Sequence, residues 1–210
     1  MNKKIIDSKF IKAFYNKEIS SLELAKIYFD NELYSAANTF FNVHLGEILN
    51  TNKFEEKSYC ISQIALCYLL QQKDKNYGEW QLSMIHDTAS DAIVFNPNNY
   101  IAWYCVGESY RLLNDNKKAY YCYSYIIMNL LDDIKPEDEN IIYNMIFVLF
   151  DILYMINIIK YDYFINKIMN WYINSKNYDF MKYVDLMNKI YDHKTQLSEE
   201  EKNIINNKYN

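Results

Sequence analysis

Histidine and the isolated glycines are the first residues to test for chemistry in this chain. His44, His86 and His193 lie far apart, and none stands in an H-x-x-x-H or H-E-x-x-H pattern. A zinc site on neighbouring helical turns is therefore not predicted, and only convergence of the three rings in the fold would supply one. The three glycines are also isolated, whereas a phosphate-binding loop needs several close together. We expect no metal, no nucleotide and no other cofactor.

The four cysteines form no C-x-x-C pair, and each lies within an apolar helical pattern: Cys60, Cys67, Cys105 and Cys122. This usage favours reduced core thiols over a disulfide framework and predicts a reducing, cytoplasmic location. A nucleophilic Cys60 or Cys67 beside His86 is the alternative. The seven-residue spacing of those two cysteines favours a shared packed helix face instead. We predict that the protein is not an enzyme.

Charge excludes two classes of partner. The chain has 210 residues with 22 basic and 27 acidic side chains, a net charge of -5, and Arg111 as its single arginine. A nucleic-acid interface needs clustered cations, so neither nucleic acid nor an anionic membrane surface is an expected partner. At the N-terminus, Asp7, Lys9 and Lys12 interrupt any apolar core of a signal peptide.

Low glycine and proline content makes helices the expected element. An amphipathic helix is predicted over 3–16, followed by a capping box at Ser20 and Glu23 that starts a new helix. Asn96-Pro97-Asn98-Asn99 marks a boundary, with proline ending one helix and asparagine capping the next.

Beyond 133, helices are predicted up to about Ile159, starting at Pro136, and over 161–174, 178–193 and 198–208, the last opened by a second capping box at Ser198 and Glu201. The apolar run 141–159 nearly reaches the length of a membrane span. Asp151 at its centre would cost about 3 kcal/mol in lipid, which favours a buried helix.

One stretch carries a specific spacing of large and small side chains. Small residues let two antiparallel helices approach, and large residues fill the spaces beside them. The residues that make this pattern are Trp103, Val106, Gly107, Tyr110, Ala119 and Tyr123. The pattern resembles the tetratricopeptide repeat, W-x-x-L-G-x-x-Y followed by A-x-x-x-F, over about 34 residues.

The same template fits an earlier segment, where Ser21 replaces the aromatic residue. The matching positions are Leu24, Ala25, Tyr28, Ala37 and Phe41. A middle unit places Ile64, Ala65 and Tyr68 on the template and requires about eight extra residues around 72–80.

The resemblance implies an all-α fold, an α-α superhelix of tetratricopeptide-like hairpins with a C-terminal helical cap. It comprises an N-terminal helix (1–17), three hairpins within 18–133 (18–51, 58–99 and 100–133) and the cap (134–210). An independent second domain over 134–210 is the alternative.

In this family the first helix of each hairpin lines a groove that holds a peptide or helix. By register, the predicted partner-binding residues are Lys26, Phe29, Tyr59, Leu66, Tyr104, Glu108 and Arg111. Ile19, Leu22, Ser62, Leu69 and Ile101 extend the set. The cationic clamp of the chaperone-binding members is missing, and a mainly apolar groove fits a hydrophobic helix, either a partner's or the chain's own.

The resemblance therefore implies a non-catalytic scaffold or adaptor for protein–protein interaction. A weaker likeness, in residues 24–37, 59–68 and 96–104, is to helical repeat segments that accompany glycosyltransferases, including phage-encoded ones. It implies an accessory module of a glycan-modifying system as the alternative, and a viral assembly component is a third. The partner is expected to be a protein or peptide, whose identity the sequence does not fix, nor does it fix the oligomeric state.

Overall fold

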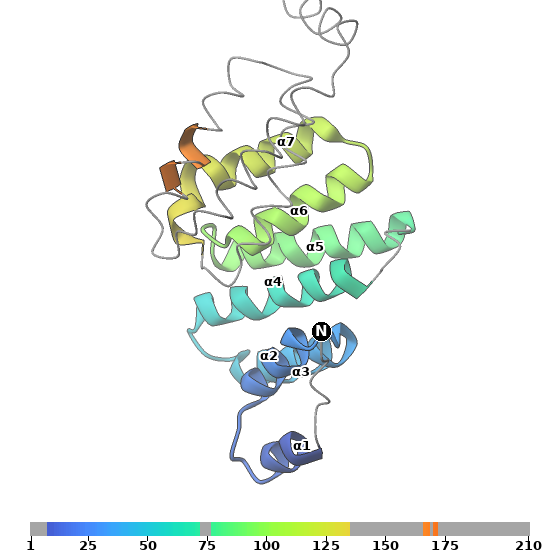
Figure 1. Ribbon diagram of the computed structural model, residues 1–210, viewed down its shortest axis with the longest axis vertical. Helices are drawn as coiled ribbons and strands as arrows, with labels where there is room; N and C mark the ends of the chain where they lie inside the picture. The colour runs from blue at the N-terminus through green and yellow to red at the C-terminus, as the bar shows by residue number, and fades with distance from the viewer. Residues whose placement is uncertain (1–7, 72–76, 135–165, 169, 172–210) are drawn as a thin grey trace, which may run out of the picture. The chain divides into compact units, whose positions relative to one another are not determined.

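The computed structural model describes residues 8–71, 77–134, 166–168 and 170–171, and every regular element in these ranges is helical (Figure 1). The all-α prediction is thereby confirmed for this part of the chain, which contains no strand. The helices are α1 (Ser8–Tyr15), α2 (Ser21–Asp30), α3 (Tyr34–Ile48), α4 (Phe54–Gln71), α5 (Glu79–Phe95), α6 (Tyr100–Leu112) and α7 (Asn116–Tyr125).

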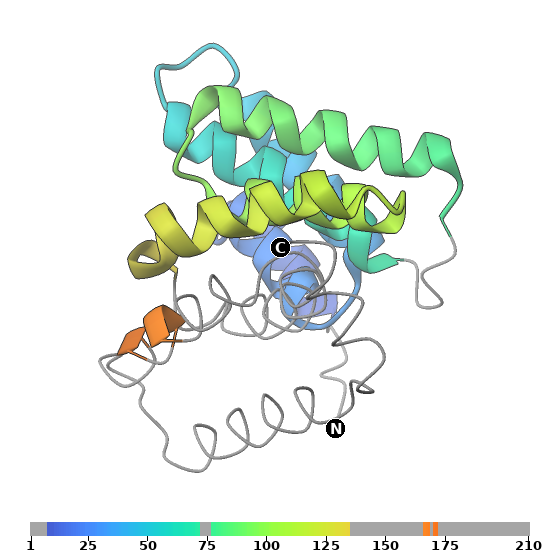
Figure 2. The ribbon, with the colours of Figure 1, turned by 90° about the horizontal axis from the view of Figure 1, so that it is seen from above.

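Contacts divide the chain into two compact units, residues 1–119 and 120–210, with the boundary inside α7. In the first unit, helices that follow one another in sequence also pack against one another from α1 through α6, and α4 additionally contacts α6. Figure 2 shows α5 in green running alongside α4 in teal. This packing in chain order is the arrangement expected of successive antiparallel helix pairs.

Two of the helix starts are capped as the sequence predicts. The backbone N–H of Ser20 donates to the Glu23 carboxylate at 2.7 Å, and the Ser20 hydroxyl accepts from the Glu23 backbone at 3.1 Å. The bond from the Ser20 backbone lowers the pKa of Glu23. At α6, the Asn99 side chain accepts from the backbone N–H of Ala102 at 3.2 Å. Both caps satisfy donors that a helix start leaves unpaired.

Three helices end in the same kind of turn. Lys17, Glu32 and Asn114 follow α1, α2 and α6 and adopt φ values of 59°, 61° and 62°. In this left-handed conformation the chain reverses, and the next N–H donates to a carbonyl one turn back in the helix. Short turns of this type join α2 to α3 and α6 to α7.

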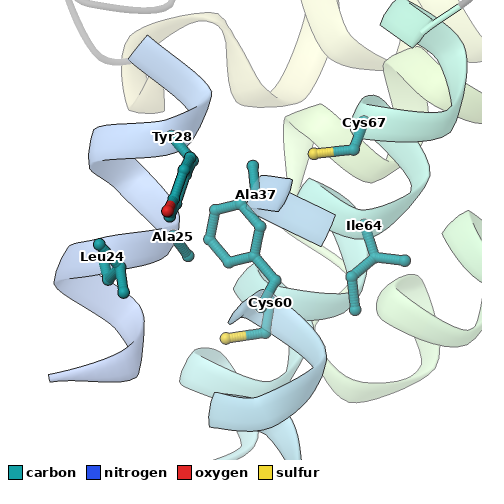
Figure 3. Close-up of a cluster of buried hydrophobic side chains, with 8 residues drawn as sticks. Leu24, Ala25, Tyr28, Ala37, Cys60, Ile64 and Cys67 are labelled. Atoms are coloured by element: carbon teal, nitrogen blue, oxygen red, sulfur yellow. The ribbon is translucent and has the colours of Figure 1, made fainter. Parts of the chain in front are cut away.

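Side chains of α2, α3 and α4 form one buried core, in which small residues lie next to large ones. Leu24, Ala25, Ala37, Phe41, Cys60 and Cys67 are fully buried, and Tyr28 and Ile64 nearly so. Figure 3 shows Leu24, Ala25 and Tyr28 on one helix, facing Ala37 and then Cys60, Ile64 and Cys67. The predicted motif residues of the first hairpin thus belong to one core cluster. Ala25 and Ala37 leave room for close helix approach.

The motif residues of the third hairpin are also mostly inside the protein. Val106, Gly107, Ala119 and Tyr123 are buried, while Trp103 and Tyr110 are half-buried. The Trp103 indole N–H donates to the Pro97 carbonyl at 2.8 Å, and the Tyr110 hydroxyl lies 3.0 Å from His86 Nε2.

A buried polar network ties α4 to the boundary before α6. The Asn99 amide donates to the Ser58 carbonyl at 3.1 Å, to its hydroxyl at 2.9 Å and to the Ser62 hydroxyl at 3.0 Å. Ser58 in turn donates to the carbonyl of Ala92 in α5 at 2.7 Å. Because buried polar groups need partners, this network fixes the position of the boundary on α4.

The longer connection predicted around 72–80 falls between α4 and α5. Residues 72–76 lie outside the described part of the chain, and on their far side Tyr77 donates its hydroxyl to the carbonyl of Leu69. After α7 the chain continues in a π-helical turn, η1 (Ile126–Leu130), and a 3₁₀ turn, η2 (Leu131–Asp133). The described helical residues 166–168 and 170–171 fall within the helix predicted over 161–174.

The remaining predictions for the C-terminal part concern residues outside the described ranges. These are the helix starting at Pro136, the buried run 141–159 with Asp151, the helices over 178–193 and 198–208, the capping box at Ser198 and Glu201, and His193. Among the helices that the structure does describe, none combines the length and apolar character required to cross a bilayer.

Candidate functional site

Three of the predicted groove residues of the first two hairpins lie close together. The ammonium group of Lys26 in α2 lies 5.4 Å from the centre of the Tyr59 ring in α4. Lys26 is exposed, and Phe29 and Tyr59 are half-buried. We call Lys26, Phe29 and Tyr59 the α2–α4 surface. It brings together the first helices of two successive hairpins, which are distant in sequence.

Aromatic rings beneath this surface hold it in place. Phe41 of α3 is fully buried and meets Phe29 edge-on at 6.5 Å and Tyr59 edge-on at 6.2 Å. Phe29 also meets Tyr34 edge-on at 5.4 Å. Edge-to-face pairs of this kind add stabilisation beyond area burial and fix ring orientation. Phe41 therefore supports both aromatic rings of this surface.

Of the other predicted groove residues, Arg111 is half-buried and the remaining three are buried. Leu66, Tyr104 and Glu108 are exposed by only 4%, 5% and 5%. Glu108 accepts from Arg111, with Nη2 to Oε2 at 2.7 Å and Nε at 3.2 Å from both carboxylate oxygens. These four positions are engaged in packing or in pairing within the chain.

The extended set divides in the same way. Ile19 and Leu22 are half-buried and pack against the core of the first hairpin. Ser62, Leu69 and Ile101 are buried. Apart from the half-buried Arg111 on α6, the accessible residues of the predicted groove lie on or just before α2 and at its contact with α4.

A polar cluster that sequence reasoning missed lies where α2, α3 and α4 meet. His44 Nδ1 is 3.0 Å from both Ser21 Oγ and Glu47 Oε2, and His44 Nε2 is 2.8 Å from Glu56 Oε1. The sequence could have indicated the contact between His44 and Glu47, because the two residues lie three apart in one helix. Ser21 and Glu56 join it only through the fold.

The residue types in this cluster match a serine–histidine–carboxylate arrangement, but their hydrogen bonding and burial do not suit nucleophilic catalysis. The Ser21 hydroxyl donates to Glu47 at 2.6 Å and is exposed by only 2%. A nucleophile needs access to substrate and a base that accepts its proton. Ser21 lacks that access, and its proton is directed to a carboxylate whose lowered pKa makes it a weak base, so the cluster is a structural junction.

The thiols are equally unsuited to nucleophilic chemistry. Burial raises the pKa of Cys60 and Cys67 to about 12 and that of Cys122 to about 11, and it raises the pKa of Cys105 as well. Reactivity requires the thiolate. His86 is 3.0 Å from Tyr110 and 3.1 Å from Asp87, contacts that occupy both ring nitrogens. In the described residues, no group of His, Cys, Asp or Glu could hold a metal ion.

Comparisons with known proteins add no relative. No family model matches the chain, and neither the curated proteins nor the solved structures give a match. The class that the fold defines is accordingly a helical protein built, in its first unit, from successive packed helices.

Proposed function

We propose that this chain is a non-catalytic interaction scaffold that binds a protein segment along a tetratricopeptide-like groove. The α2–α4 surface is the site of first contact. Lys26, Phe29 and Tyr59 offer one exposed cation and two half-buried aromatic rings, which suit an apolar helix or extended peptide with an acidic side chain beside it.

The observation that carries the proposal is the contact between Lys26 and Tyr59. A groove lined by the first helix of each hairpin requires those helices to share a face across the boundary between hairpins. The 5.4 Å approach of the Lys26 ammonium group to the Tyr59 ring provides this for the first two hairpins. The curved superhelix and the third hairpin's part in the groove belong to the same proposal.

Lys26→Glu reverses the charge at this surface without disturbing a buried group and tests the proposal. The full chain and the variant are immobilised, and proteins retained from an extract of the cells that produce the chain are quantified. Lys117→Glu is the matched control, because Lys117 is an exposed lysine on α7. We expect a defined protein retained by the wild type and by Lys117→Glu but lost with Lys26→Glu.

Circular dichroism of each variant verifies that the helices persist. Identical retention by all three chains would reject the α2–α4 surface as the binding site. Loss of the retained protein with both variants would show that net charge, and not this surface, drives the retention.

A further inference from the structure

His44 connects three helices at the junction of the first and second hairpins. The ring is exposed by only 8%. Its Nδ1 faces Ser21 of α2 and Glu47 of α3, both at 3.0 Å, and its Nε2 faces Glu56 of α4 at 2.8 Å. Each nitrogen therefore lies within hydrogen-bond distance of a carboxylate oxygen.

The number of available protons decides the state of this ring. A neutral imidazole has one N–H donor, whereas the imidazolium has two. The single hydroxyl proton of Ser21 is donated to Glu47 at 2.6 Å and so does not serve Nδ1. Only the doubly protonated ring donates to Glu47 and Glu56 at the same time.

Charges around the ring balance when it is protonated. Glu47 comes from its own helix, and Glu56 from α4 binds Lys53 at 2.9 Å through its other oxygen. The start of α2 at Ser21 opposes a cation through its dipole, and the nearby end of α3 favours one. Two carboxylates and two cations then form a neutral group, whereas a neutral ring would leave one excess negative charge.

We propose that His44 is a proton-dependent clamp that holds the first hairpin on the second when the ring is charged and loosens this junction when the ring loses a proton. In the neutral ring one nitrogen presents a lone pair to a carboxylate, so a charge-assisted bond is replaced by repulsion. The clamp concerns the folded chain alone and does not depend on the proposed partner.

The pH window follows from the partners. Hydrogen bonds from Ser21 and His44 lower the pKa of Glu47, and those from Lys53 and His44 lower the pKa of Glu56. Both carboxylates therefore stay ionised in mildly acidic solution, and the clamp holds there. Its contribution to stability is lost once the ring is neutral.

A double-mutant cycle on the full chain measures the clamp. His44→Gln, Glu56→Gln and the double variant are unfolded in urea at pH 6 and pH 8.5, and the coupling is the change that the single variants do not explain. We expect coupling of roughly tenfold or more in the unfolding equilibrium constant at pH 6, typical of hydrogen bonds to charged groups. Little coupling should remain at pH 8.5.

Glu55→Gln is the matched control, because it removes the same charge from an exposed neighbour on the same helix. The coupling of Glu55→Gln with His44→Gln should be small at both pH 6 and pH 8.5. Coupling between His44 and Glu56 that is equal at pH 6 and pH 8.5, or no larger than that of Glu55, would overturn the proposal.

Nitrogen NMR of the wild-type ring provides the test if His44→Gln does not fold. Two protonated nitrogens at pH 6, with loss of one proton accompanied by shifts in amides of α2 and α4, would support the clamp. A single neutral tautomer throughout this range would overturn it.

Discussion

Glu32 and Asn114 occupy the same place in two separate turns. Each lies two residues beyond the end of its helix, with φ of 61° and 62°. The next residue donates back in the same way, Leu33 N–H to the Tyr28 carbonyl at 3.0 Å and Asp115 N–H to the Tyr110 carbonyl at 2.9 Å. The α2–α3 and α6–α7 connections therefore turn by the same local mechanism, and Tyr28 and Tyr110 occupy the same position of the predicted pattern.

Substitution by glycine should change stability by different amounts at Glu32 and Asn114, because the two native residues differ in how well they tolerate this conformation. A left-handed conformation costs an ordinary L-residue about 1–2 kcal/mol, and asparagine tolerates it better than glutamate does. Glycine relieves this strain, but part of the stability gained is cancelled because glycine makes the unfolded chain more flexible. We expect Glu32→Gly to raise the free energy of unfolding by about 0.5–1 kcal/mol and Asn114→Gly by less. Urea denaturation measures both, and a loss of stability in Glu32→Gly would refute the turn geometry.

Gly46 and Gly78 should respond to alanine in opposite directions. A Cβ at Gly46, within α3, would meet no atom within 4 Å, so Gly46→Ala should stabilise by about 0.5–1 kcal/mol through helix propensity. A Cβ at Gly78, the N-cap of α5, would lie 3.3 Å from the Trp80 ring. Alanine is also a poor N-cap, so Gly78→Ala should destabilise. Thermal unfolding of both variants measures these opposite changes in stability. A less stable Gly46→Ala chain would contradict the exposed position of that glycine.

Asn99 is the position where a single amide should matter most. Asn99→Ala removes the cap of α6 and leaves the buried hydroxyls of Ser58 and Ser62 without this donor. We expect the free energy of unfolding to fall by about 2–4 kcal/mol from the two effects together. The exposed Asn98→Ala variant is the control and should change stability by less than about 0.5 kcal/mol. Equal urea midpoints for the two variants would show that the network does not exist.

The cysteines should be protected from alkylation in the folded chain. With a pKa of about 12 for Cys60 and Cys67, little thiolate exists at pH 8. We expect labelling by iodoacetamide only as urea unfolds the chain, with all four sites then modified. Mass spectrometry of each cysteine peptide follows this. Rapid modification of Cys60 or Cys67 in buffer would contradict their burial.

Local signals in the sequence were sufficient for much of the fold. The capping box at Ser20 and Glu23 and the asparagine cap at Asn99 involve neighbours three residues apart, so the chain alone specifies them. The spacing of Ala25 and Ala37 likewise predicted small residues inside a core of larger ones. The hydrogen bonds from Asn99 to Ser58 and Ser62 cross a helix boundary, and no local pattern specifies them.

The candidate site shows the limit of the register argument. Register assigns Leu66 and Tyr104 to the first helices of their hairpins, but it does not say what covers them, and both are buried. Glu108 and Arg111 stand three residues apart and form an ion pair within α6, which the register argument, with its focus on a partner, did not consider. At Ser21 the sequence showed only a departure from the aromatic pattern. The fold explains it, because Ser21 lies against His44, where an indole would displace the polar cluster.

Site-specific photo-crosslinking tests the proposed α2–α4 surface most directly. A benzophenone side chain replaces Asp30, exposed on α2 one turn after Lys26, in one chain and Asp91, exposed on α5, in a control chain, so that both chains keep Lys26. Irradiation in an extract of the producing cells should give one discrete adduct with a second protein from position 30 alone. Excess wild-type chain should abolish this adduct, and excess Lys26→Glu chain should not. Equal adducts from both positions, or a crosslink from position 30 only to the chain itself, would contradict a partner-binding groove there.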